Sequence, residues 1–135
     1  MAKLLFLDDD VSTLQLMKMA ATVLGHEIVT TTCVSEALQL AESQKPQLIF
    51  ADLGCLQDLD GNLFIHQFCH SATVEGIPVI IVSAGWSGAD EFRIEKNGHK
   101  RFLTKPITME HLTQAVEDYV DQHVSDRTIS FASQG

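Results

Sequence analysis

Three short stretches of the chain are apolar without interruption, at residues 4–7, 48–51 and 79–82. A continuous apolar run of this length is typical of a strand that is buried on both faces of a parallel sheet. Two weaker strand candidates lie at residues 27–31 and 101–104. The pattern therefore predicts five strands.

Segments with helical spacing lie between these runs. The first is expected to stop at Gly25, since glycine is common just past the end of a helix, and its apolar positions are Leu14, Met17, Met19, Ala21 and Leu24. Further helices are predicted at residues 34–42, 62–71 and 89–96. The last helix follows Thr108, a good N-terminal cap, and its apolar stripe consists of Met109, Leu112, Val116, Tyr119 and Val120.

Strand and helix thus alternate five times along the chain. Such alternation predicts right-handed crossovers and a doubly wound α/β fold, in which helices cover both faces of a five-stranded parallel sheet. We expect one domain over residues 1–124. Residues 125–135 are mostly small and polar, and we expect them to form a loose tail.

Composition and charge narrow the classes of partner. The chain has 135 residues, of which 45% are hydrophobic, and 18 Asp and Glu against 9 Lys and Arg give a formal charge of −9. An acidic surface disfavours direct binding to nucleic acid or to anionic lipid. The three cysteines have no CxxC spacing, and no signal peptide or membrane-spanning run is evident, so we expect a cytoplasmic protein with reduced thiols.

Polar residues follow four of the predicted strands at the point where each ends. They are Asp8, Asp9 and Asp10 after the first run, Asp52 after the third, Ser83 after the fourth, and Lys105 with Pro106 after the fifth. The carboxyl ends of parallel strands form one edge, which is where open α/β sheets bind their ligands. We therefore expect these side chains to form one site.

The residue types at this edge indicate phosphoryl chemistry. Carboxylates from two strand ends would repel one another without a cation between them, and Mg²⁺ prefers such oxygen ligands. A carboxylate can also act as a nucleophile and form an aspartyl phosphate. Phosphoryl transfer mainly requires neutralisation of the phosphoryl oxygens, which Mg²⁺, Lys105 and Ser83 would supply.

The same motifs resemble those of the receiver domains of response regulators in two-component signalling. Four segments carry the resemblance: LLFLDDD at residues 4–10, LIFAD at 48–52, VIIVSA at 79–84 and FLTKP at 102–106. The resemblance covers residues 3–123 in the correct order. It implies the flavodoxin-like strand order 2-1-3-4-5 with five helices.

Roles for individual residues follow from this resemblance. It implies that Asp52 accepts a phosphoryl group from a phosphohistidine on a histidine kinase or phosphotransfer protein. Asp8 and Asp9 would bind Mg²⁺, together with Asp52 and the backbone carbonyl of Gly54. Lys105 would pair with a phosphoryl oxygen.

The resemblance also implies a switch. Ser83 would bind a phosphoryl oxygen and move towards it, and Phe102 would turn inward as Ser83 moves. The output surface for a downstream effector would consist of the fourth helix, the fifth strand and the last helix, and the last helix is also a possible site of homodimerisation.

The loop after Asp52 departs from the family pattern. Receivers usually continue from the phosphoacceptor through Met-Pro to Asp-Gly, whereas residues 52–61 read DLGCLQDLDG, without the proline and with one extra residue. This loop borders the expected metal pocket. Gly54 and Gly85 near the pocket mouth would leave water access open, which would make a phosphorylated state short-lived.

Two other functions are compatible with parts of the sequence. A pseudo-receiver would act only as a protein-interaction module, and the altered loop keeps this alternative open. A phosphatase of the haloacid-dehalogenase type would use Asp8 as nucleophile and Asp10 as acid/base. The short chain, without an evident cap domain, argues against the phosphatase. Asp9 and Asp10 are also placed to cap the first helix.

Overall fold

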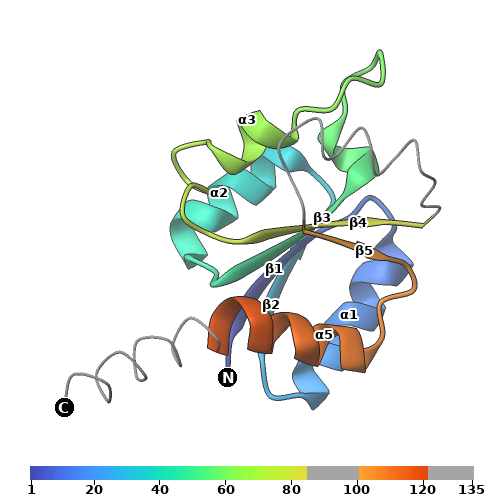
Figure 1. Cartoon of the computed structure of the whole chain (residues 1–135), viewed down its shortest axis with the longest axis vertical. Helices are drawn as coiled ribbons and strands as arrows, with labels where there is room; N and C mark the ends of the chain where they lie inside the picture. Colours follow the sequence, from blue (N-terminus) through green and yellow to red (C-terminus); the bar gives the residue numbers. More distant parts are fainter. Residues whose placement is uncertain (85–100, 122–135) are drawn as a thin grey trace.

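The computed structural model describes residues 1–84 and 101–121. Its centre is a parallel sheet of five strands in the order β2-β1-β3-β4-β5 (Figure 1). The strands are β1 (Lys3–Leu7), β2 (Glu27–Thr31), β3 (Leu48–Asp52), β4 (Val79–Ser83) and β5 (Phe102–Thr104). The expected strand order and the α/β class are confirmed.

Helices cover both faces of this sheet. The described α-helices are α1 (Val11–Val23), α2 (Val34–Gln44), α3 (Ile65–Cys69) and α5 (Met109–Val116), and a π-helical turn (Glu117–Asp121) extends α5. In Figure 1, α1 and α5 lie below the sheet and α2 and α3 lie above it. The helix expected at residues 89–96 and the tail expected at 125–135 lie outside the described residues.

The sheet separates two hydrophobic cores. On the side of α1 and α5, the aromatic rings of Phe6 and Phe50 stack with centroids 4.7 Å apart. On the other side, the small residues Ala37 and Ala41 of α2 pack over Leu5 and other strand residues. Successive strand residues alternate between these cores, so β1 and β3 read as continuous apolar runs rather than as alternating ones.

Local signals define the helix ends. The Asp10 side chain caps α1 by accepting a hydrogen bond from the Ser12 backbone N–H at 3.1 Å. Gly25 follows the end of α1 with φ +84°, a conformation that L side chains rarely adopt. The Thr108 hydroxyl accepts the His111 backbone N–H at the start of α5. The predicted stop at Gly25 and cap at Thr108 are therefore confirmed.

Two local expectations were wrong. Met19 is 66% exposed, because the buried face of α1 is formed by Leu14, Met17 and Ala21 instead. The helix expected at residues 62–71 is restricted to Ile65–Cys69.

A hydrogen-bonded turn precedes α3, so the helix starts only at Ile65. The Asp58 carboxylate accepts the backbone N–H groups of Asp60 and Asn62, each at 2.9 Å, and the Asp58 N–H donates to the Asn62 carbonyl. Leu63 bridges back to Gln57. The backbone groups of Asn62 and Leu63 are therefore paired within the turn and not within the helix. Within the described ranges, no helix has the length and apolar character needed to cross a bilayer.

The stacked pair in the core gives a first prediction. Phe50→Ala should lower the free energy of unfolding by about 3–5 kcal/mol, because it removes a fully buried ring and leaves a cavity against Phe6. Leu16→Ala, on the exposed side of α1, should change it by less than about 0.5 kcal/mol. Urea denaturation of both variants checks this, and equal losses would show that the stack does not organise this core.

Candidate functional site

The strand register brings the predicted site residues to one edge of the sheet. Leu7 pairs with Ala51, and Asp52 pairs with Val82, so Asp8 and Asp52 emerge side by side from β1 and β3. Ser83 pairs with Thr104 at the ends of β4 and β5. Lys105 follows directly, and its backbone N–H donates to the Ser83 carbonyl at 2.8 Å.

Lys105 lies between two carboxylates. Its Nζ is 2.6 Å from Asp8 Oδ2 and 3.1 Å from Asp52 Oδ1. The side chain of Asp8 is fully buried, and those of Asp52 and Lys105 are 12% and 17% exposed. Burial lowers the pKa of Lys105, but the hydrogen bonds to Asp8 and Asp52 outweigh it and leave that pKa raised. Lys105 is therefore a cation at neutral pH.

Asp8 uses both of its carboxylate oxygens. Oδ1 accepts the Asp10 backbone N–H at 2.9 Å. Oδ2 lies 2.6 Å from the ammonium of Lys105, which is its charge partner. Both contacts hold the carboxylate in place at the end of β1.

Asp52 retains an unfavourable negative charge. Burial raises the pKa of the Asp52 carboxyl, the neighbouring Asp8 charge raises it further, and Lys105 only partly offsets both effects. Asp52 Oδ2 accepts the Gly54 backbone N–H at 3.0 Å. A Cβ at position 54 would lie 2.9 Å from the same oxygen. A side chain there would therefore displace the carboxylate or the turn.

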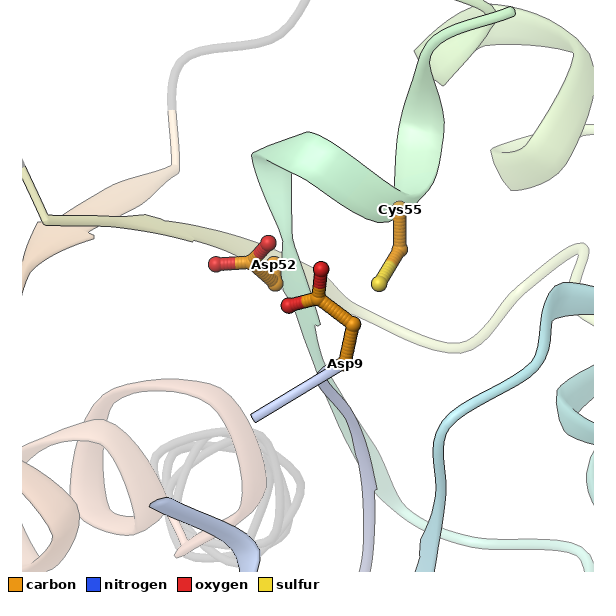
Figure 2. Close-up of side chains that lie close together, drawn as sticks. All are labelled: Asp9, Asp52 and Cys55. Carbon is orange, nitrogen blue, oxygen red and sulfur yellow. The ribbon is translucent and has the colours of Figure 1, made fainter. Parts of the chain in front are cut away.

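Asp9 and Cys55 also lie close to Asp52. One ligand atom from each of Asp9, Asp52 and Cys55 lies within 4.8 Å of the other two. Figure 2 shows the Cys55 sulfur turned towards the Asp9 carboxylate. Burial raises the pKa of the Cys55 thiol to about 12, with further contributions from the charges of Asp52 and Asp9.

Cys55 was not among the residues expected at this site. It belongs to η1 (Leu53–Leu56), a single 3₁₀ turn whose N-terminal cap is Asp52. Side chains three residues apart lie on the same side of a 3₁₀ turn, so Cys55 returns to the side of Asp52. The sequence signal that could have identified Cys55 is its position three residues after Asp52, directly after a strand. A sequence pattern alone does not specify a 3₁₀ turn there.

The remaining predicted residues lie at the margin of the site. Ser83 is partly buried at the end of β4. Phe102 pairs with Ile81 in the sheet and packs against the core on the side of α2 and α3. Gly54 is exposed and contributes its N–H to Asp52. Gly85 lies outside the described residues.

This arrangement fits a divalent cation. Asp8, Asp9 and Asp52 face one ammonium, so negative charge remains in excess, as the raised pKa of Asp52 also indicates. Carboxylate oxygens from two adjacent strand ends are suitable ligands for Mg²⁺. Asp9 is exposed and Asp52 is partly accessible, so an ion and a substrate could both reach them.

Known proteins match this chain in sequence. Residues 4–117 match the model of the response regulator receiver domain. The chain is 34% identical over 122 residues to the transcriptional regulatory protein GlrR of Escherichia coli K12, covering 90% of this chain and 27% of GlrR. It is 26% identical to protein PilH of Pseudomonas aeruginosa, covering 86% of this chain and 95% of PilH.

A solved structure agrees in fold. The chemotaxis protein CheY4 of Vibrio cholerae superposes with a TM-score of 0.73 at 22% identity, covering 89% of this chain and 99% of that chain. The present chain thus spans about a quarter of GlrR but nearly all of PilH and CheY4.

The excess negative charge gives a second prediction. With metal chelated, Asp52→Asn should raise the urea midpoint at neutral pH, because it removes a buried charge that Lys105 only partly offsets. Folded Asp52 binds its proton more tightly than the unfolded side chain, so the contribution of Asp52 to wild-type stability falls as pH rises from 3.8 towards the raised pKa. The gain in Asp52→Asn should therefore shrink as pH is lowered.

The matched control is Asp60→Asn. It makes the same change of net charge at an exposed position and should leave the midpoint nearly unchanged. A lower midpoint for Asp52→Asn at neutral pH would mean that Lys105 more than compensates the Asp52 charge.

Proposed function

This chain belongs to the response regulator receiver domain family, and on that basis we propose that it accepts a phosphoryl group on Asp52 from the phosphohistidine of a partner protein. Receiver domains are signalling domains rather than conventional enzymes. The observation that carries the proposal is the position of Lys105. Its ammonium contacts the partly accessible carboxylate of Asp52 and the buried carboxylate of Asp8.

The proposed reaction is a displacement at phosphorus. An oxygen of the Asp52 carboxylate attacks, a P–O bond forms, and the P–N bond to the donor imidazole breaks. Lys105 stays charged and stabilises a phosphoryl oxygen. The Gly54 N–H orients Asp52 through Oδ2, which leaves the oxygen near Lys105 directed towards the phosphoryl group.

Mg²⁺ would neutralise phosphoryl oxygens when bound in the pocket. Asp9 and Asp52 are the accessible carboxylates that would hold it, with Asp8 acting directly or through water and the Gly54 carbonyl as a further ligand. The absence of a side chain at Gly54 leaves room for the Asp52 carboxylate, which a Cβ there would crowd.

A switch would follow from the new charge on Asp52. Ser83 adjoins Lys105 through a backbone hydrogen bond, so its hydroxyl would bind a phosphoryl oxygen and draw the end of β4 inward. Phe102 is paired with β4 and would follow this movement. The surface formed by β5 and α5 would change as a result. An effector or a second copy of the chain would bind that surface.

The proposed partners are a histidine kinase or a histidine phosphotransfer protein upstream and an effector protein downstream. Such partners act in the cytoplasm, which we propose as the location of this chain. A stand-alone regulator and a relay intermediate remain alternatives, since the relatives include both longer and equally short proteins.

The phosphatase alternative is disfavoured by burial. Asp8 would have to be its nucleophile, but the Asp8 side chain is fully buried and its oxygens contact Lys105 and the Asp10 N–H. Asp10 caps α1, and its carboxylate also accepts a hydrogen bond from the Thr13 hydroxyl. The pseudo-receiver alternative is favoured only by the unusual loop after Asp52.

A labelling experiment tests the proposed function. Incubation with acetyl phosphate and Mg²⁺ should add one phosphoryl group, detected by intact mass and mapped to Asp52, and Asp52→Asn should remove the label. A label on Asp8 would indicate the phosphatase alternative. No label on a folded wild type would indicate the pseudo-receiver.

Metal binding gives a separate prediction. Mg²⁺ at about 100 times its dissociation constant should stabilise the wild type by about 2.7 kcal/mol, since it binds only the folded site. Asp9→Asn should lose most of the accompanying rise in melting temperature, whereas Asp60→Asn should retain it. An equal rise in all three proteins would exclude Asp9 as a ligand.

A further inference from the structure

We propose that the pocket beside Asp52 binds a thiophilic divalent cation of the Zn²⁺ class through Asp9, Asp52 and the thiol of Cys55, in competition with Mg²⁺. The inference rests on the proposed function, because it concerns the metal pocket of the same phosphoacceptor. It adds a ligand that the resemblance to receivers did not supply.

The fold places Cys55 at the pocket for structural reasons. In the turn η1, Leu53 and Leu56 are both buried and anchor one side. The spacing of three residues per turn puts Asp52 and Cys55 together on another side. Cys55 is partly buried and its sulfur points towards Asp9 (Figure 2). The thiol position is therefore set by the packing of the turn.

The three donor atoms are close to a ligating arrangement. They come from the end of β1, the end of β3 and η1, and they lie within 4.8 Å of one another. Tetrahedral Zn²⁺ with bonds of about 2.1 Å to oxygen and about 2.3 Å to sulfur separates its ligands by roughly 3.4–3.6 Å. A closure of little more than about 1 Å, within the range of side-chain rotation, would complete the protein ligands.

The ligand types discriminate between cations. Mg²⁺ requires oxygen ligands and keeps several waters, so the thiol adds nothing to its binding. Zn²⁺, Co²⁺ and Cd²⁺ accept sulfur together with carboxylate oxygen. Cys55 would release its proton to solvent as it ligates, and water would complete the coordination.

Sharing of Asp52 gives this site a regulatory consequence. An ion held by the sulfur and by the Asp9 and Asp52 carboxylates would take the place of Mg²⁺ in the pocket. The supply of thiophilic cations would then set which ion lies beside Asp52 in a given molecule. The other cysteines do not contribute, since neither Cys33 nor Cys69 belongs to the cluster.

Co²⁺ provides a spectroscopic test in the reduced, full-length protein. Titration of the wild type with CoCl₂ should produce a thiolate-to-metal charge-transfer band in the near ultraviolet at one equivalent. ZnCl₂ should abolish the band stoichiometrically, and MgCl₂ only in large excess. Cys55→Ser should lack the band, whereas Cys33→Ser and Cys69→Ser, the matched controls, should retain it.

Asp52→Asn tests whether the thiol and the phosphoacceptor share one ion. This variant should retain the charge-transfer band but should raise the Co²⁺ dissociation constant by about tenfold or more. Circular dichroism of each variant verifies folding. Absence of the band in the wild type, its persistence in Cys55→Ser, or an unchanged dissociation constant in Asp52→Asn would each overturn the inference.

The outcome is separable from that of the proposed function. If the inference fails, the wild type is still labelled at Asp52 by acetyl phosphate and Mg²⁺. If the proposed function fails, that label is absent while the Co²⁺ band remains.

Discussion

The ammonium of Lys105, held between the carboxylates of Asp8 and Asp52, is the interaction on which this end of the domain depends. Asp8 has no exposed surface, and an unpaired carboxylate in such a place would cost several kcal/mol. One ammonium satisfies Asp8 but cannot balance Asp9 and Asp52 as well. The pocket is therefore stable enough to fold and still negative enough to attract a second cation.

The two hydrophobic cores fix the positions of these charged side chains. Residues of β1 and β3 alternate between the core under α1 and α5 and the core under α2 and α3, so both strands are fixed on both faces. Their last residues then emerge at fixed positions. Side chains that project from rigid strand ends are placed more accurately than side chains on free loops. Asp52 ends β3, and Asp8 and Lys105 directly follow β1 and β5, whereas Cys55 comes from the turn η1.

Much of this arrangement was predictable from local signals. Continuous apolar runs identify strands that are covered on both faces, and Gly25 and Thr108 mark helix ends by their own backbone chemistry. Strand order and parallel register then bring Asp8, Asp52 and Lys105 together. Met19 and Cys55 were not predictable in the same way. The first depends on which side of α1 faces the sheet, and the second on a 3₁₀ turn that is selected by the burial of Leu53 and Leu56.

The turn that follows η1 differs from the strand ends at this edge, because its backbone N–H groups pair with a side chain of the turn itself. Asp58 binds the backbone of Asp60 and Asn62, and the side chain of Leu59 projects fully into solvent. The hydrogen bonds that Asp58 accepts from Asp60 and Asn62 therefore lie within the turn itself. The exposed tip at Leu59 is consequently a natural grafting point for a peptide tag or a fluorescent reporter, a few residues along the chain from Asp52.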